Sequence, residues 1–173
     1  MTDTPADVSA LVERVTSRKG QAYAVELSAH LLQDLLDRME LTGAGADVDV
    51  RLALGAACTT AARTVDQFVA ALQLPYAASR GWEDMFHQLG EGGTSHRSYV
   101  FVADAGELLR HEEFELWHRL VDEVRGGPYC LGGGWTTVIL VDDEYGWSRS
   151  RFGTAVAAEE AARAGLQHSE RPR

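Results

Sequence analysis

The sequence predicts an α/β protein with a mainly parallel sheet. Three segments have strand character: residues 48–54 alternate apolar and polar side chains, residues 99–103 are continuously apolar, and residues 136–141 (TTVILV) are the most β-prone run in the chain. Helical patterns separate these segments in the order strand, helix, helix, strand, helix, strand. Because strands that alternate with helices pair in parallel through right-handed crossovers, we expect a sheet covered by helices.

The pattern divides the chain into three parts. Residues 1–46 read as an N-terminal helical extension that ends in the small residues around Gly43 and Gly45. Residues 47–145 hold the three expected strands and form the α/β domain. Residues 146–173 contain an Ala-rich helical pattern over 154–166 and end in a polar tail.

Residues 23–40 have an ambiguous beginning. One apolar stripe at helical spacing consists of Leu27, Leu31, Leu35 and Met39. The helix either includes residues 23–27, or those residues form a short strand and Ser28 caps a helix that begins at Ala29. The stripe itself packs on its own domain or serves self-association, which would make the chain a homodimer.

Three helices are expected between the strands of the α/β domain. The first opens near Thr64 and ends at the Leu74-Pro75 step, because a residue before proline disfavours the helical conformation. The second is compact, spans residues 82–89 and ends at Gly90. The third is expected over residues 106–125, before the break at Gly126-Gly127-Pro128.

The composition limits the partners of the protein. The chain has 173 residues, of which 45% are hydrophobic, and 16 basic against 26 acidic residues give a net charge of −10. Binding to nucleic acid or to an anionic membrane draws its affinity from clustered Lys and Arg, so neither is expected. The acidic balance favours a basic protein partner.

The cysteines and the apolar runs point to a cytoplasmic protein. Cys58 and Cys130 lie far apart and belong to no CxxC or Cys/His cluster, so neither a disulfide framework nor a zinc site is expected. The first residues have early acids and no apolar core of a signal peptide, and no apolar run approaches the length of about 20 residues that a membrane span needs.

No motif predicts a cofactor, a metal site or a catalytic residue. Neither GxGxxG nor GxxxxGK[ST] occurs, and the glycines 132–134 precede a strand, whereas phosphate-binding loops follow one. Glu115 and His118 form a single Glu-x-x-His pair, where a di-iron bundle needs two. Glu83 and His87 are four residues apart on one helix, but no nucleophile motif accompanies them, so a small His/Glu hydrolase is only a minor alternative.

The segment around the compact helix has the composition of a recognition surface. Trp82 and Phe86 are four residues apart and lie beside the acids Glu83 and Asp84, behind a loop that holds Tyr76. Aromatic residues with charged neighbours are typical of protein-binding hot spots, and an aromatic pair at this spacing is equally typical of plain core packing.

Residues 74–89 (LPYAASRGWEDMFHQL) resemble the diagnostic segment of the barstar family of ribonuclease inhibitors. In that segment a Leu-Pro step and an aromatic loop precede a short acidic helix. Glu83 stands at the place of the first family acid, and His87 stands where the second acid is usual. The resemblance covers about residues 48–142. It implies a small three-stranded parallel sheet packed with helices, and a helix and loop that enter the basic active site of a ribonuclease.

We therefore expect an immunity-type inhibitor that blocks a basic ribonuclease or toxin and uses no cofactor and no metal. The alternative is a non-inhibitory regulatory or scaffold module that associates with itself. The expected partner-binding residues come from the loop and the compact helix: Tyr76, Arg80, Glu83, Asp84, His87 and Glu91.

Overall fold

A computed structural model of the chain describes residues 5–17, 22–43, 48–91, 97–124 and 135–150. Its helices and strands, in chain order, are α1 (Pro5–Ser17), β1 (Ala22–Glu26), α2 (Ala29–Gly43), β2 (Val48–Leu54), α3 (Ala61–Leu72), α4 (Trp82–Glu91), β3 (Arg97–Ala103), α5 (Phe114–Val124), β4 (Trp135–Asp142) and α6 (Glu144–Arg149). Three 3₁₀ turns, η1 (Gly55–Ala57), η2 (Tyr76–Arg80) and η3 (Ala105–Glu107), connect some of these elements.

The four strands form one parallel sheet in the order β1-β4-β3-β2. This confirms the predicted α/β class and the small parallel sheet packed with helices. The sheet has four strands rather than three, because Ala22–Glu26 takes the short-strand alternative and pairs with β4 from Ala22 opposite Val138 to Glu26 opposite Asp142.

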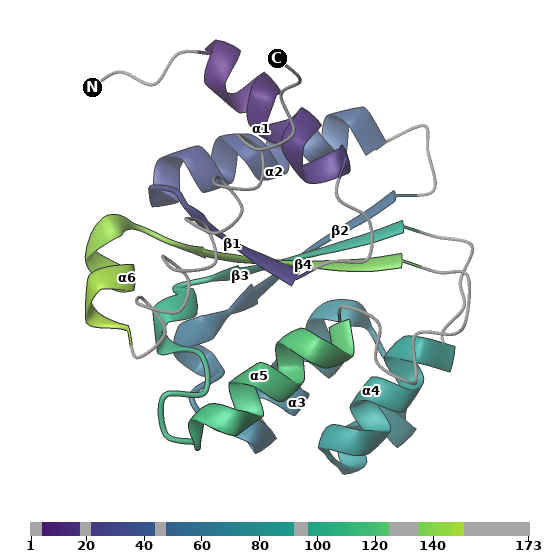
Figure 1. Cartoon of the computed structure of the whole chain (residues 1–173). Helices are drawn as coiled ribbons and strands as arrows, with labels where there is room; N and C mark the ends of the chain where they lie inside the picture. The colour runs from purple at the N-terminus through teal and green to yellow at the C-terminus, as the bar shows by residue number, and fades with distance from the viewer. Residues whose placement is uncertain (1–4, 18–21, 44–47, 92–96, 125–134, 151–173) are drawn as a thin grey trace, which may run out of the picture.

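Helices cover both faces of the sheet, and β3 shows how the sequence achieves this. Tyr99 and Phe101 are buried on the face that packs against α1 and α2, whereas Val100 and Val102 are buried on the face of α3, α4 and α5. Figure 1 shows α1 and α2 on one side of the sheet and the other three helices on the opposite side. Continuous apolar character in a strand therefore reports burial on both faces.

The stripe on α2 belongs to this core. Leu35 and Met39 are almost fully buried among residues of α1 and the sheet, and Leu27 and Leu31 pack with them. The boundary at residue 46 and a homodimer stay predictions, but the structure ties residues 22–43 to the sheet through β1 and through this stripe. A dimer built on the stripe would need side chains that the chain's own sheet already covers.

The predicted helix over residues 106–125 begins later, at Phe114. Leu109 adopts a left-handed conformation with φ 54°, which a continuous helix does not allow. Its amide donates to the Cys58 carbonyl at 2.8 Å, and the His111 amide donates to the Thr59 carbonyl at 3.0 Å. These bonds hold the segment against the end of β2, so the contacts of the fold override the helical pattern. The predicted helix over 154–166 lies outside the described residues.

No helix in the described part of the chain is both long and apolar enough to cross a membrane.

Candidate functional site

The carboxyl edge of the sheet is the first place where this topology can build a ligand site. The chain leaves β1 through α2 on one face and then returns from β2 to β4 through α3, α4 and α5 on the other face. The connection that leaves β1 thus lies on one face, and the connections that lead to β4 lie on the other. The direction in which the chain winds around the sheet therefore reverses beside β1 and β4. Open parallel sheets bind ligands outside the carboxyl ends of their strands at such a reversal.

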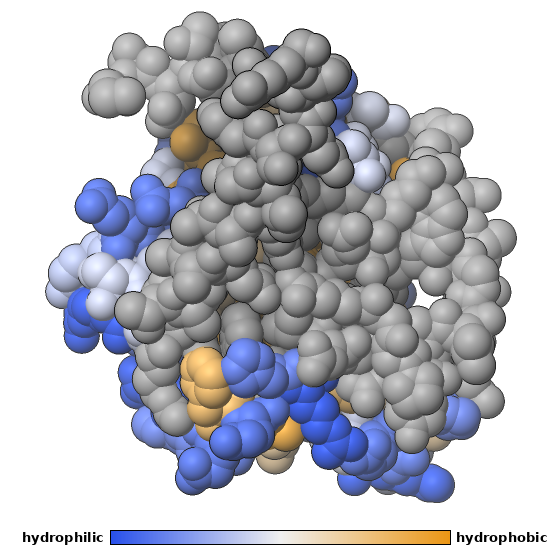
Figure 2. Space-filling view, viewed as in Figure 1, coloured by the Kyte–Doolittle hydropathy of each residue, from blue (hydrophilic) through white to orange (hydrophobic). Residues whose placement is uncertain are grey.

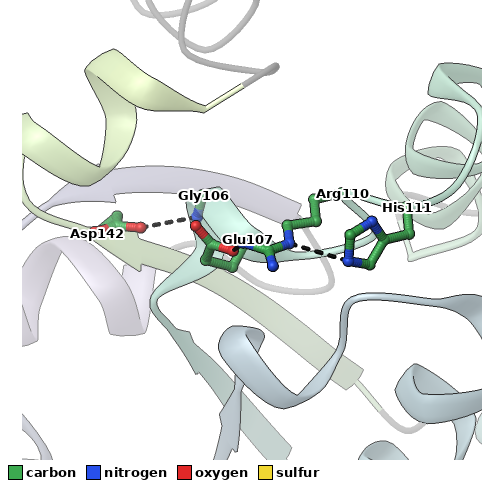
Figure 3. A network of polar contacts seen from close by, with 5 residues as sticks. All are labelled: Gly106, Glu107, Arg110, His111 and Asp142. Carbon is green, nitrogen blue, oxygen red and sulfur yellow. Dashed lines mark hydrogen bonds and ion pairs between the residues drawn. The ribbon is translucent and has the colours of Figure 1, made fainter.

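Asp142, the last residue of β4, holds this edge together. Its Oδ2 accepts a hydrogen bond from the Gly106 amide at 2.8 Å, and its Oδ1 accepts one from the Asp143 amide at 2.9 Å. Its backbone carbonyl accepts from the Leu27 amide at 3.0 Å, just beyond β1. Figure 3 shows the Asp142 carboxylate pointing toward Gly106. One residue thus connects the ends of β1 and β4 with the turn after β3.

Two glycines leave room for this carboxylate. A Cβ atom on Gly146 would lie 1.8 Å from Oδ1 of Asp142, and a Cβ atom on Gly106 would lie 2.9 Å from Oδ2. Both distances are shorter than van der Waals contact, so any larger residue would displace Asp142. We call the arrangement of Gly106, Asp142, Asp143 and Gly146 the Asp142 latch.

The surroundings of Asp142 disfavour its ionised form. Burial raises the pKa of Asp142, and the neighbouring carboxylates of Asp104 and Asp143 raise it further. The hydrogen bonds from the Gly106 and Asp143 amides act in the opposite direction. Asp143 is occupied as well, because its Oδ1 caps α6 by accepting from the Gly146 amide at 2.7 Å. Asp104 has a left-handed backbone with φ 51°.

Two hollows flank the latch. One of about 280 Å³ is lined by Ala56, Asp104, Gly106, Glu107, Asp142, Asp143, Tyr145, Gly146 and Arg149. The other, about 70 Å³, is lined by Leu27, Ala29, Leu32, Ala103, Asp104, Val141, Asp142 and Asp143. Within the described residues no group of three or more His, Cys, Asp or Glu side chains is arranged to hold a metal ion.

Glu107 lies beside the larger hollow and takes part in a polar chain that leads away from it. Arg110 forms an ion pair with Glu107 and donates from Nε to Nε2 of His111 at 3.2 Å. Figure 3 shows the three side chains in a row along the turn after β3. The side chains of Glu107 and Arg110 are nearly half exposed, so this chain is a surface feature.

The second candidate region is the η2–α4 surface, which we define by Tyr76, Arg80, Glu83, Asp84 and His87. All five side chains are exposed, and Tyr76 has 83% of its surface in solvent. In the view of Figure 2 mostly hydrophilic residues cover the molecule over α4 and α5. Glu91 ends α4, and its side chain lies outside the described part of the structure.

Buried residues fix the η2–α4 surface to the core. Ala78 of η2 and Met85 of α4 are fully buried, and Phe86 is 4% exposed. Trp82 packs edge-on against Phe86, with ring centroids 5.3 Å apart, and both contact the core. The aromatic pair therefore serves packing, and the exposed aromatic of this surface is Tyr76.

Two members of the predicted Glu/His pairs, Glu83 and His118, contact other side chains. Glu83 forms an ion pair with Arg119 of α5, and both side chains are about half exposed. His118, the imidazole of the Glu-x-x-His pair, packs edge-on against Phe114 with ring centroids 4.5 Å apart. None of these contacts brings a nucleophile to a base, so they offer no catalytic arrangement among the described residues.

The comparisons with known proteins identify a fold and no family. No protein-family model matches the chain, and no curated protein matches it. The chain is similar to two solved structures of the ORC2 protein of Aeropyrum pernix, one described as ADPNP-ADP complexes and one as the ADP form. The TM-scores are 0.66 and 0.68, each at 14% identity. The matches cover 86% and 88% of this chain but 43% and 45% of the ORC2 chains, so it spans less than half of their length.

These findings correct the resemblance to the barstar family. The two solved structures reported above are ORC2 chains, and no family model supports a ribonuclease inhibitor. The expected inhibition of a ribonuclease or toxin and the immunity and toxin–antitoxin functions are therefore wrong. The physical reason is that the order of strands and helices that carried the resemblance is common to parallel α/β sheets in general.

The sequence reasoning missed the Asp142 latch. Asp142 and Asp143 were visible only as acids that end a β-prone strand. The signal that could have found them is their position, because acids directly after a central parallel strand lie at the edge where ligands or neighbouring turns are held.

Proposed function

We propose that this chain is a non-catalytic, cytoplasmic protein-binding module that binds a partner with a basic surface through its η2–α4 surface. The observation that carries the proposal is Tyr76. It is 83% exposed at the start of a turn that buried Ala78 fixes to the core. An exposed tyrosine on an anchored turn with charged neighbours is the kind of residue that dominates binding energy in protein interfaces.

The charge of the chain supports a basic partner. Asp84 and Glu83 lie in the first turn of α4, and the whole chain carries a net charge of −10. Opposite charge on a partner would raise the rate of association and would select against acidic proteins. The free, buried Cys58 thiol fits a reducing compartment.

The test compares the wild-type chain with Tyr76→Ala, Asp84→Lys and a matched charge reversal on the other side of the sheet, Asp37→Lys on α2. Partners captured from a lysate of the source organism are identified, and their affinities are then measured by calorimetry with purified proteins. We expect one basic protein whose affinity falls at least about tenfold for Tyr76→Ala and Asp84→Lys. Asp37→Lys should bind like wild type.

Equal affinity of wild type and Asp84→Lys for every captured protein would contradict the proposal. So would a partner whose binding is lost with Asp37→Lys and kept with Tyr76→Ala, because that result would place the interface on α2. Unchanged melting temperatures of the variants are the control that excludes loss of folding as the cause.

The names of the ORC2 structures raise nucleotide binding as a second candidate function, because those structures hold ADPNP and ADP on a related fold. The residues at the carboxyl edge of this chain decide against it.

A further inference from the structure

We infer that the carboxyl edge of this sheet is closed to nucleotides and other phosphorylated ligands by the Asp142 latch. This inference does not depend on the proposed protein binding, because it concerns the carboxyl edge of the sheet and not the η2–α4 surface. It rests on the connection between β1 and α2, on the charges around the latch and on the size of the hollows.

The connection between β1 and α2 is too short to cradle a phosphate. β1 ends at Glu26 and α2 begins at Ala29, so Leu27 and Ser28 are the whole loop. Phosphate-binding loops present several free backbone amides in a glycine-rich turn before a helix. Here the Leu27 amide is bonded to the Asp142 carbonyl, and the Leu31 and Leu32 amides are bonded to Ser28.

The charge beside this connection repels phosphate. The hollow next to Leu27 and Ala29 is lined by the carboxylates of Asp104, Asp142 and Asp143. The sequence has one lysine, Lys19, so no lysine lies among the described residues to offset them. A metal ion could reverse the sign, but no metal-binding group of side chains occurs among the described residues.

The smaller hollow is also too small for a nucleotide, and the larger one has an acidic lining. The one beside β1 has about 70 Å³, far below the several hundred Å³ of ordinary ligand pockets. Among the described residues, the larger one is lined by four carboxylates and one cation, Arg149. Arg149 donates to the Tyr145 hydroxyl at 2.8 Å and lies 5.0 Å from the centre of its ring.

Asp142 cannot swing aside to admit a ligand. Both of its carboxylate oxygens accept backbone hydrogen bonds, and Gly106 and Gly146 pack directly against it. Moving it would leave the partly buried Gly106 amide without its acceptor, which costs more than a surface rotamer change.

The test titrates the full chain with MgADP and with MgATP by calorimetry and follows its backbone amides by NMR. We expect no saturable heat up to about 1 mM nucleotide, the limit of weak specific binding. The amides of residues 27–32, 106 and 142–146 should keep their chemical shifts. A nucleotide-binding protein titrated in parallel shows that the assay works.

Saturable binding with shifts at those amides would overturn the inference, whereas binding with shifts confined to other residues would support it by placing the nucleotide elsewhere. A second variant separates charge from the missing cradle. Asp104→Asn with Asp143→Asn removes two charges while keeping a residue suited to the left-handed position and a capping side chain. We expect this variant to remain without binding, and nucleotide binding by it would contradict the claim that the short connection, with its Leu27, Leu31 and Leu32 amides already bonded, cannot cradle a phosphate.

Discussion

The carboxyl edge and the η2–α4 surface use acidic residues in opposite ways. At the edge, Asp142 and Asp143 accept hydrogen bonds from backbone amides of the chain itself. On the η2–α4 surface, Asp84 is exposed and Glu83 pairs with the partly exposed side chain of Arg119. Backbone amides are fixed by the fold, whereas an exposed arginine gives up its partner at little cost.

The difference shows what makes an acid available to a partner. The carboxyl edge has the topology of a ligand site, but its carboxylates accept hydrogen bonds from the chain's own backbone. The η2–α4 surface presents its groups to solvent on a frame anchored by buried residues. Variants that damage the edge should therefore lower stability, and variants on the η2–α4 surface should leave it nearly unchanged.

The largest loss of stability is expected for Gly146→Ala. Alanine favours the helical conformation of α6, but its Cβ atom would lie 1.8 Å from Oδ1 of Asp142. The clash forces Asp142 out of place, and we expect a loss of about 3 kcal/mol in the free energy of unfolding. Urea unfolding measures it. Gly81→Ala is the matched control, because nothing lies within 4 Å of a Cβ atom there.

A smaller loss is expected for Asp142→Ala. The change leaves the Gly106 amide without an acceptor in a partly buried place, and the exposed Asp143 amide is left to bond with water. We expect a loss of about 2 kcal/mol, against about 1 kcal/mol for Asp143→Ala, which removes only the cap of α6. Urea unfolding of both variants tests this order, and equal losses would show that the latch is no more than a helix cap.

The pH dependence of stability tests the electrostatics of the latch. Burial holds the pKa of Asp142 above its ordinary value of 3.8 in the folded chain. As the pH falls through the folded pKa, the folded state takes up a proton that the unfolded state does not yet bind. The contribution of Asp142 to stability therefore rises as the pH falls toward 3.8.

Unfolding free energies of wild type and Asp142→Asn between pH 7 and pH 4 provide the measurement. The difference between them should shift in favour of wild type at the acidic end, and NMR titration of the Asp142 carboxyl carbon should give the raised pKa directly. A shift in the other direction would mean that the two amide hydrogen bonds outweigh burial.

Much of the fold was predictable from local patterns. The alternation in 48–54 and the apolar run at 99–103 identified β2 and β3 as strands. The apolar run correctly indicated burial on both faces of β3, whereas in β2 Leu52 and Leu54 are exposed and Ala53 is buried. The start of α5 was not predictable, since the bonds that hold Leu109 and His111 reach back to Cys58 and Thr59. The pattern of residues near Leu109 in the sequence cannot identify partners that lie this far away along the chain.

The two candidate regions also differ in how much of each can be predicted from the local sequence. Exposure of five predicted residues on η2 and α4 follows from the amphipathic pattern of one short segment, in which Met85 and Phe86 face inward. Their binding role stays a prediction. The latch joins residues that are 36 positions apart, Gly106 and Asp142, so only the fold reveals it.

The smallest effect is expected for the ion pair between Glu83 and Arg119. Their side chains are 59% and 46% exposed, so water and salt screen the attraction. A double-mutant cycle with Glu83→Gln and Arg119→Gln in urea unfolding should give a coupling of about 0.5 kcal/mol or less, falling further in high salt. A coupling as large as the loss from Asp142→Ala would break the contrast between the regions, because Glu83 would then be held by the fold and would not be free to meet a partner.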